Sequence, residues 1–238
     1  MSPLEYALVF AVMIGAAALQ GGVGFGMNVL AAPVAALVEP RLVPGPLVCG
    51  ALALTLLMAR RERAHVEWRG LGWFTAGRLP GTTGGALFLA ALPVRAVVLT
   101  VGASVLLAAL LSLTRLALRP TPRTLVAAGV VSGFSGTVSS IGGPVVAVVY
   151  SHSKGPVIRA TLSAIFVLSS VISLVALAAV GRLGQEELRL ALLIIPPIVL
   201  GYASSGWLAR HLDQGRTRKA VLSVSVLGAL VVIASALV

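Results

Sequence analysis

Long apolar stretches, separated by short charged or Pro/Gly-containing connections, make up most of the chain. They predict helical segments at residues 3–19, 43–59, 71–91, 94–113, 124–131, 157–180, 188–209 and 219–238. A helix that crosses a membrane needs about 20 mostly apolar residues, so the chain has room for roughly seven to nine membrane segments. The pattern therefore predicts an all-α polytopic membrane protein in which residues 1–238 form a single transmembrane domain.

Two further apolar stretches, residues 29–38 and 144–150, are too short to span a membrane alone. Each follows a glycine-rich stretch: the first runs from Gln20 to Asn28 and on to Pro33, and the second from Ser132 to Pro144. Glycine and proline interrupt helices, so we expect each short stretch to be a half-helix after a break. Non-helical backbone at membrane depth is tolerated where protein or a water-filled cavity satisfies its polar groups. Both breaks are therefore predicted to line an internal cavity.

The two halves of the chain resemble each other when the sequence is shifted by 111 positions. The shift aligns Gly22 with Gly133 and Pro33 with Pro144, so the same spacing from glycine to proline recurs once in each half. Duplication of a broken membrane helix is typical of transporter binding sites. We therefore expect a first repeat at residues 1–118 and a second at residues 119–238.

Basic residues favour one topology, because cytoplasmic loops carry an excess of Lys and Arg. If each broken segment crosses the membrane once, the basic residues divide eight against nine between the two sides. If each is a re-entrant hairpin, they divide four against thirteen, with Arg78 set aside as intramembrane. Each half then has an odd number of crossings, so the halves have opposite orientations. This predicts two inverted-topology repeats, each a re-entrant or broken helical hairpin plus three transmembrane helices, in the cell inner membrane with both termini outside.

Composition agrees with a membrane location, since 58% of residues are hydrophobic, 11% are charged and the mean hydropathy is +1.03. No soluble core could hide that much apolar surface. The net charge of +11 lies in short turns, and only 5% of residues are aromatic, so we expect membrane lipid and not nucleic acid beside the basic loops. Cys49 lies in an apolar run, and the histidines have no metal-binding spacing. Neither a metal nor another cofactor is expected.

Neutral hydrogen-bonding groups gather at both breaks, as amides in the first and hydroxyls in the second. Pro144 suits the start of a half-helix because its missing N–H costs nothing there, and the free N–H groups of such a start favour an anion. For single glycines we favour simple close packing of helices, but for the paired clusters followed by proline we favour a cavity. The candidate substrate-binding residues are Gln20, Gly22, Gly24, Gly26, Asn28, Pro33, Arg78, Gly133, Ser135, Gly136, Ser139, Ser140, Gly142, Gly143 and Pro144.

Arg78 lies inside the predicted segment at residues 71–91, where a buried cation is costly and usually functional. It either contacts the substrate or its entry path, or snorkels to lipid headgroups from near the cytoplasmic end. All seven acidic residues fall in predicted loops or termini. No catalytic residues are expected, since a carboxylate proton relay or a membrane-embedded enzyme would need acids within the segments.

At the two breaks the sequence resembles the TauE/SafE family of membrane permeases, whose members carry a glycine-rich motif ending in proline in each half. The matching stretches are residues 21–33 and 132–144, and Ser-Gly-Phe-Ser-Gly followed by Ile-Gly-Gly-Pro-Val makes the second more specific. In the first, Met27 and Asn28 stand where the family pattern has more glycine. The resemblance covers essentially the whole chain, and it implies export of sulfite, organosulfonates or related small anions across the cytoplasmic membrane of a prokaryote.

A transporter explains the duplication and both breaks, with the anion held near the membrane midplane and exposed alternately as the two halves rock. A passive anion channel would use the same site without alternating access. A membrane-embedded enzyme acting on lipid phosphate would need the missing acids, and a structural subunit would leave the breaks unexplained. Small-residue faces allow a homodimer without requiring one.

Overall fold

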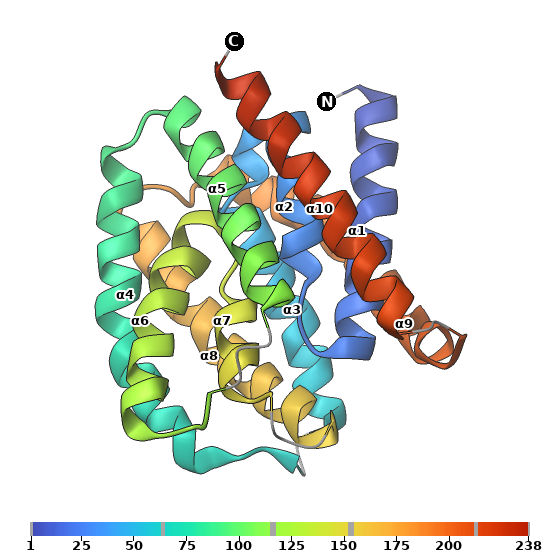
Figure 1. Cartoon of the computed structure of the whole chain (residues 1–238). Helices are drawn as coiled ribbons and strands as arrows, with labels where there is room; N and C mark the ends of the chain where they lie inside the picture. The colour runs from blue at the N-terminus through green and yellow to red at the C-terminus, as the bar shows by residue number, and fades with distance from the viewer. Residues whose placement is uncertain (1, 63–64, 115–117, 152–154, 212–213, 238) are drawn as a thin grey trace.

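A computed structural model describes residues 2–62, 65–114, 118–151, 155–211 and 214–237, which form an all-helical bundle without strands (Figure 1). Each predicted segment lies mostly within a helix of the described chain, and α4 and α5 have the predicted bounds. The elements are α1 Pro3–Val23, α2 Met27–Val38, η1 Pro40–Leu42, α3 Gly45–Glu62, η3 Trp68–Gly70, α4 Leu71–Ala91, α5 Val94–Leu113, α6 Pro122–Ser139, α7 Gly143–Val149, α8 Gly155–Ala179, α9 Gln185–His211 and α10 Gln214–Leu237.

Local capping signals set the starts of the two helices that lead into the breaks. Ser2 and Glu5 form a reciprocal capping box: the Ser2 hydroxyl accepts from the Glu5 N–H at 3.3 Å, and the Glu5 carboxylate accepts from the Ser2 N–H at 2.7 Å. Thr121 and Thr124 cap α6 in the same way. A proline follows each cap at the first helical position, where its missing N–H is harmless.

Two helical hairpins enter the bundle from opposite ends. α1 starts at the end where both chain termini lie, and α2 turns back toward it (Figure 1). α6 and α7 form the second hairpin from the other end, where the Leu118 N–H, just before α6, donates to the carbonyl of Val148 in the last turn of α7 at 3.2 Å. Each hairpin therefore returns to its own end of the bundle.

The helices pack in four main pairs: α4 on α6, α1 on α9, α3 on α8 and α5 on α10. The helices of the α4–α6 pair approach closely because glycines of α4 lie directly against the backbone of α6. A Cβ added to Gly77 or Gly81 of α4 would lie 2.0 or 2.2 Å from the carbonyl oxygens of Val126 and Val130. Small residues four apart let membrane helices approach in this way, so these glycines serve packing, as we favoured for single glycines.

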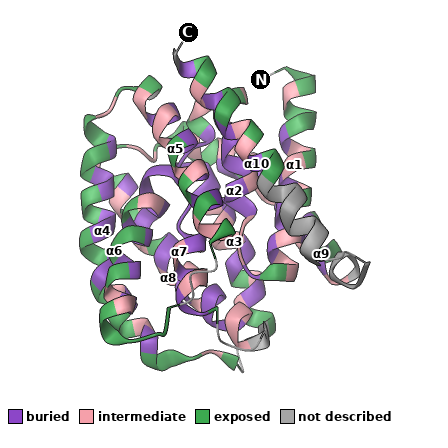
Figure 2. Cartoon of the chain, in the orientation of Figure 1, coloured by how far each residue is buried: buried purple, intermediate pink, exposed green. Residues whose placement is uncertain are grey.

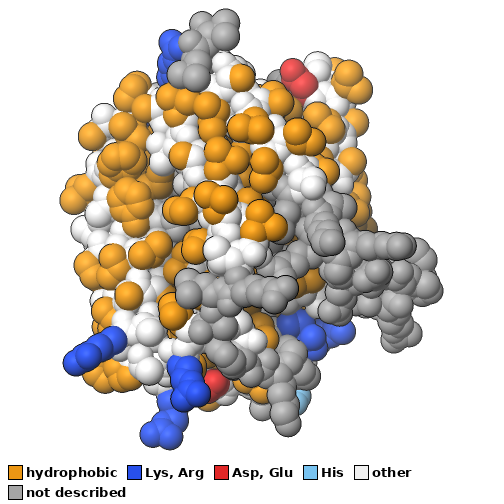
Figure 3. Space-filling model, viewed as in Figure 1, with side chains coloured by type: hydrophobic (Ala, Val, Ile, Leu, Met, Phe, Trp, Pro, Cys, Tyr) orange, Lys and Arg blue, Asp and Glu red, His pale blue; other side chains and the backbone are white. Residues whose placement is uncertain are grey.

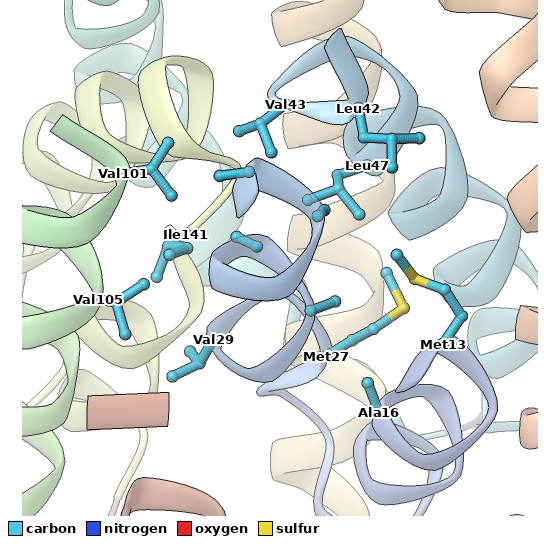
Figure 4. Packing of buried hydrophobic residues seen from close by; sticks show 14 of the residues in the cluster. Met13, Ala16, Met27, Val29, Leu42, Val43, Leu47, Val101, Val105 and Ile141 are labelled. Carbon is cyan, nitrogen blue, oxygen red and sulfur yellow. The ribbon is translucent and has the colours of Figure 1, made fainter. Parts of the chain in front are cut away.

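The largest apolar cluster surrounds α2, whose residues lie between α1, α3 and α5 (Figure 4). Met13 of α1 and Met27 of α2 fill its interior, and each is at most 1% exposed. Ile141, from the break between α6 and α7, joins the cluster near Val101 and Val105 of α5 (Figure 4). The second break is therefore anchored in the core that encloses the first half-helix.

Exposed residues lie along the outer faces of the helices (Figure 2), and on the face shown in Figure 3 hydrophobic side chains cover the middle of the bundle. By length and composition, four helical stretches of the described chain can cross a membrane: Pro3–Val23, Arg95–Leu113, Val157–Ala179 and Gln185–Gly206. Most Lys and Arg side chains visible in Figure 3 lie at the end opposite the termini. Arg63, Arg115 and Lys154, which the topology count includes, lie outside the described residues.

The helix breaks are much shorter than predicted. α1 continues through Val23 and α6 through Ser139, so only residues 24–26 and 140–142 interrupt the helices. The two prolines aligned by the 111-residue shift occupy different helix positions, because Pro33 lies in the interior of α2 whereas Pro144 lies in the first turn of α7. Glycine lowers helix stability by only about 1 kcal/mol per residue, and close packing offsets that penalty here.

Candidate functional site

The two breaks meet at the centre of the bundle. The side-chain amide of Asn28, at the start of α2, donates to the carbonyl oxygen of Ser140 at 2.9 Å, and the Ser140 hydroxyl donates to the carbonyl of Pro44 at 3.0 Å. In the first break, the Gln20 side-chain oxygen accepts from the backbone N–H of Met27 at 2.9 Å. Amide and hydroxyl side chains thus satisfy backbone groups that the breaks leave without helical partners.

Left-handed backbone makes each break possible. Gly24 and Gly26 have φ of +105° and +113°, and Ser140 has φ of +64°. Glycine adopts this region freely, whereas most other residues are strained there. Two hydrogen bonds hold Ser140 in this left-handed conformation: its carbonyl accepts from the Asn28 side chain, and its hydroxyl donates to the Pro44 carbonyl.

A cavity of about 60 Å³ lies where the breaks meet. One water needs about 10–15 Å³ on this measure, so the space suits several waters or one small anion. The lining residues come from both breaks and from α3, α4, α6 and α8. They are Gln20, Phe25, Gly26, Asn28, Val29, Val48, Ala51, Thr55, Arg78, Ser132, Gly136, Ser140, Ile141, Gly142, Gly143, Pro144, Phe166, Ser169, Ser170 and Ser173.

Arg78 extends from α4 into this site and is only 3% exposed. One terminal nitrogen donates to the carbonyl and the hydroxyl of Ser132 at 2.7 and 3.1 Å. The other donates to the carbonyl of Ser169 at 3.2 Å and to the hydroxyl of Ser173 at 2.8 Å. The guanidinium is therefore held between α6 and α8 inside the bundle, and the alternative that it snorkels to lipid headgroups is wrong.

The positive charge of Arg78 has no acidic partner among the described residues. Its four hydrogen bonds go to carbonyl and hydroxyl oxygens, and the described ion pair, Arg189 with Glu186, is at the surface. The Arg78 Nε atom and the Ser169 hydroxyl are buried without a hydrogen-bond partner. A buried cation is stabilised chiefly by an opposite charge, so this arrangement is suited to an anion in the cavity.

Hydroxyl groups behind the guanidinium keep it in place. Ser173 receives the Arg78 hydrogen bond and also pairs with the hydroxyl of Thr137 on α6 at 2.8 Å. Both hydroxyl-bearing residues are 0% exposed. A fully buried, hydrogen-bonded network of this kind gives a side chain one defined position.

Nine of the predicted site residues line the cavity: Gln20, Gly26, Asn28, Arg78, Gly136, Ser140, Gly142, Gly143 and Pro144. They bring residues of the two breaks together with Arg78 of α4. Gly142 and Gly143 let backbone form the wall: a Cβ on Gly142 would lie 2.6 Å from the Ser132 hydroxyl.

The structure places the other six predicted residues outside the cavity lining, at Gly22, Gly24, Pro33, Gly133, Ser135 and Ser139. Gly133 packs against α4, where an added Cβ would meet the Arg78 carbonyl at 2.7 Å. The hydroxyls of Ser135 and Ser139 donate to carbonyls four residues earlier in α6. Pro33 packs near Gly228 of α10.

Sequence reasoning missed the contributions of α3 and α8. Ser169, Ser170 and Ser173 lie on α8, and Thr55 lies on α3. The signal available was the group of three serines within an otherwise apolar predicted segment, at a spacing that puts them near one face of a helix. Phe25 and Phe166 were also missed; they flank Gly143, where an added Cβ would lie 3.4 and 3.5 Å from them.

Comparison with family models matches residues 9–232 to the sulfite exporter TauE/SafE model. Neither the curated proteins nor the solved structures contain a match to this chain.

Proposed function

Since the chain belongs to the TauE/SafE sulfite exporter family, we propose that it exports a small anion such as sulfite or an organosulfonate across the cell inner membrane by alternating access. The family is one of membrane transporters, and the apolar helices of this chain agree with that role. The observation that carries the choice of site is Arg78, a buried cation without an acidic partner among the described residues, beside a cavity of about 60 Å³.

The donors around the cavity support binding of an oxyanion. The Arg78 Nε and the Ser169 hydroxyl are buried without a hydrogen-bond partner, and both residues line the cavity. Charge-assisted hydrogen bonds from arginine to anionic oxygens are among the stronger polar contacts in proteins. A small oxyanion would satisfy these donors and compensate the buried charge at once.

The packing of the helices supports an inverted repeat. Taken in chain order, α1 to α5 of the first half correspond to α6 to α10 of the second, so the α4–α6 pair corresponds to α9–α1, and both pairs are observed. In the pairs α3–α8 and α5–α10, each helix packs against its own counterpart in the other half. Two halves related in this way, with a site between them, are the basis of rocking motions in secondary transporters.

The distribution of basic side chains supports a cytoplasmic location for the end opposite the termini. Arg60, Arg61, Arg69, Arg119 and Arg123 lie in or next to connections at that end. By the positive-inside rule, both termini then lie outside. Exposed leucines and valines would face lipid, and the small faces at Gly15 and Gly84, where an added Cβ meets nothing, allow a homodimer.

The test is uptake of labelled sulfite into liposomes that contain the purified full chain. An alternating-access carrier gives saturable uptake, and unlabelled sulfite on the opposite side accelerates it by exchange. Protein-free liposomes supply the background. Saturable uptake without exchange would favour a channel, and no uptake of sulfite or a short sulfonate would refute the proposed function.

A further inference from the structure

We propose that the site selects a monovalent anion that itself carries a hydrogen-bond donor, such as hydrogensulfite, over dianions and over monoanions without a donor. The inference rests on the proposed function, because it assumes that the central cavity is the binding site. Beyond the proposed function, it specifies the charge and the protonation state of the anion that the site binds.

The charge of the site limits the charge of its ligand. Among the described residues that line the cavity, Arg78 alone is charged. One buried cation compensates one negative charge, and an uncompensated charge in a buried site is strongly unfavourable. A dianion such as sulfate would bring a second negative charge with no partner, whereas a monoanion leaves the occupied site neutral.

The hydrogen-bonding groups of Asn28 call for a donor on the ligand. Asn28 is 8% exposed, and its amide nitrogen faces the Ser140 carbonyl at 2.9 Å. A carbonyl only accepts, so the Asn28 nitrogen must face it and the Asn28 Oδ1 must point elsewhere. That oxygen is buried and has no partner. An O–H on the ligand would satisfy it, whereas another acceptor oxygen would be repelled.

The residues that line the cavity thus carry both unpartnered donors and an unpartnered acceptor. Arg78 Nε and the Ser169 hydroxyl are unpartnered donors, and Asn28 Oδ1 is an unpartnered acceptor, all on residues that line the cavity. Hydrogensulfite in its O–H form offers both kinds of group on one small molecule. Sites built to bind a ligand hydroxyl strongly reject analogues that lack it, because their own polar groups are then left unpaired.

The experiment compares three anions in proteoliposomes with the same pH on both sides: sulfite, methanesulfonate and sulfate. Methanesulfonate is a monoanion without a donor at every pH used. As the pH falls from one unit above to one unit below the pKa of hydrogensulfite, the KM for total sulfite should fall about tenfold, following the fraction of the monoanion. The kcat/KM for methanesulfonate should not change with pH and should be roughly 10- to 100-fold lower than for hydrogensulfite. Sulfate should give no saturable flux.

The variant Asn28→Leu removes the acceptor, so it should narrow the ratio of hydrogensulfite to methanesulfonate transport. Thr83→Val is the matched control, because that hydroxyl is exposed and bonds to the Leu79 carbonyl of its own helix; it should keep the wild-type ratio. A pH-independent KM for sulfite, saturable sulfate flux or equal transport of methanesulfonate would overturn the inference while leaving the proposed function intact. If no anion gives saturable flux, the proposed function is refuted instead. The comparison of the three anions uses the wild-type protein, so it does not depend on whether Asn28→Leu folds.

Discussion

Asn28 and Ser140 lie 112 positions apart in the chain, yet the Asn28 side-chain amide donates to the Ser140 carbonyl at 2.9 Å. One residue starts the half-helix of the first hairpin, and the other ends the long helix of the second. Because the two hairpins enter from opposite ends of the bundle (Figure 1), this bond joins two halves that are proposed to move against each other.

Removing the charge of Arg78 should abolish transport. Arg78→Gln leaves an anion in the cavity without its counter-charge, and truncating one partner of a buried charge pair costs about 2–5 kcal/mol. We expect kcat/KM for sulfite to fall at least about 30-fold on that basis. Arg78→Lys should also be impaired, because lysine lacks the planar fork that contacts Ser132, Ser169 and Ser173.

Arg189→Gln is the matched control for this charge. Arg189 occupies the position that corresponds to Arg78 under the 111-residue shift, but its side chain is 75% exposed and contacts Glu186 at 3.5 Å. The Arg189→Gln variant should therefore transport sulfite at the wild-type rate. Uptake in proteoliposomes and gel filtration of each variant are the measurements; wild-type transport by folded Arg78→Gln would contradict the assigned site.

A methyl group at the α4–α6 contact should destabilise the bundle. In Gly81→Ala the new Cβ would lie 2.2 Å from the Val130 carbonyl oxygen, so the helices must separate. Overpacking of this kind costs about 1–3 kcal/mol. Gly84→Ala, three residues along the same helix, meets nothing within 4 Å and should be neutral or up to about 1 kcal/mol stabilising. Thermal unfolding in detergent measures both, and equal stability would contradict the close packing.

Filling the cavity from the Gly143 side should block the anion while the fold survives. The Cβ of an alanine there would sit 3.4 Å from Phe25 Cβ and 3.5 Å from Phe166 Cζ, which is ordinary contact, so Gly143→Ala should retain activity in part. Gly143→Leu adds about three further carbon atoms to a space that holds only a few waters, and saturable uptake should be lost.

Gly72→Leu is the control for this added bulk, because Gly72 is exposed and an added Cβ there meets nothing within 4 Å. It should insert and transport like the wild type. Retained uptake in Gly143→Leu would show that the anion takes another route.

Cysteine labelling in intact cells tests the topology. In a Cys49→Ser background, Ser2→Cys at the end with the termini should react with a membrane-impermeant maleimide added outside. Thr121→Cys at the opposite end should react only after the membrane is opened. Both positions are exposed, so the accessibility of the two cysteines differs only by the side of the membrane. The reverse labelling pattern would overturn the proposed orientation.

Much of the fold was predictable because the signals are local. The apolar runs of α4 and α5 end at charged or proline-containing connections, and their bounds follow from those alone. The extent of the breaks was not predictable in this way. Ser132 to Ser139 read as a break by composition, but they continue α6, because Gly129 and Gly133 pack directly on the backbone of α4 and the gain in packing exceeds the low helix propensity of glycine.

The amino-acid sequence by itself determined that this chain is helical, crosses a membrane, repeats a glycine-rich break in each half and carries one intramembrane arginine, since these depend on hydropathy and spacing along the chain. Only the tertiary structure decided what the arginine touches. Ser132 and Ser173 lie 54 and 95 positions from Arg78, and no periodicity in one segment specifies a partner on another. That pairing depends on which helices pack together, and therefore on burial and backbone contact across the whole bundle.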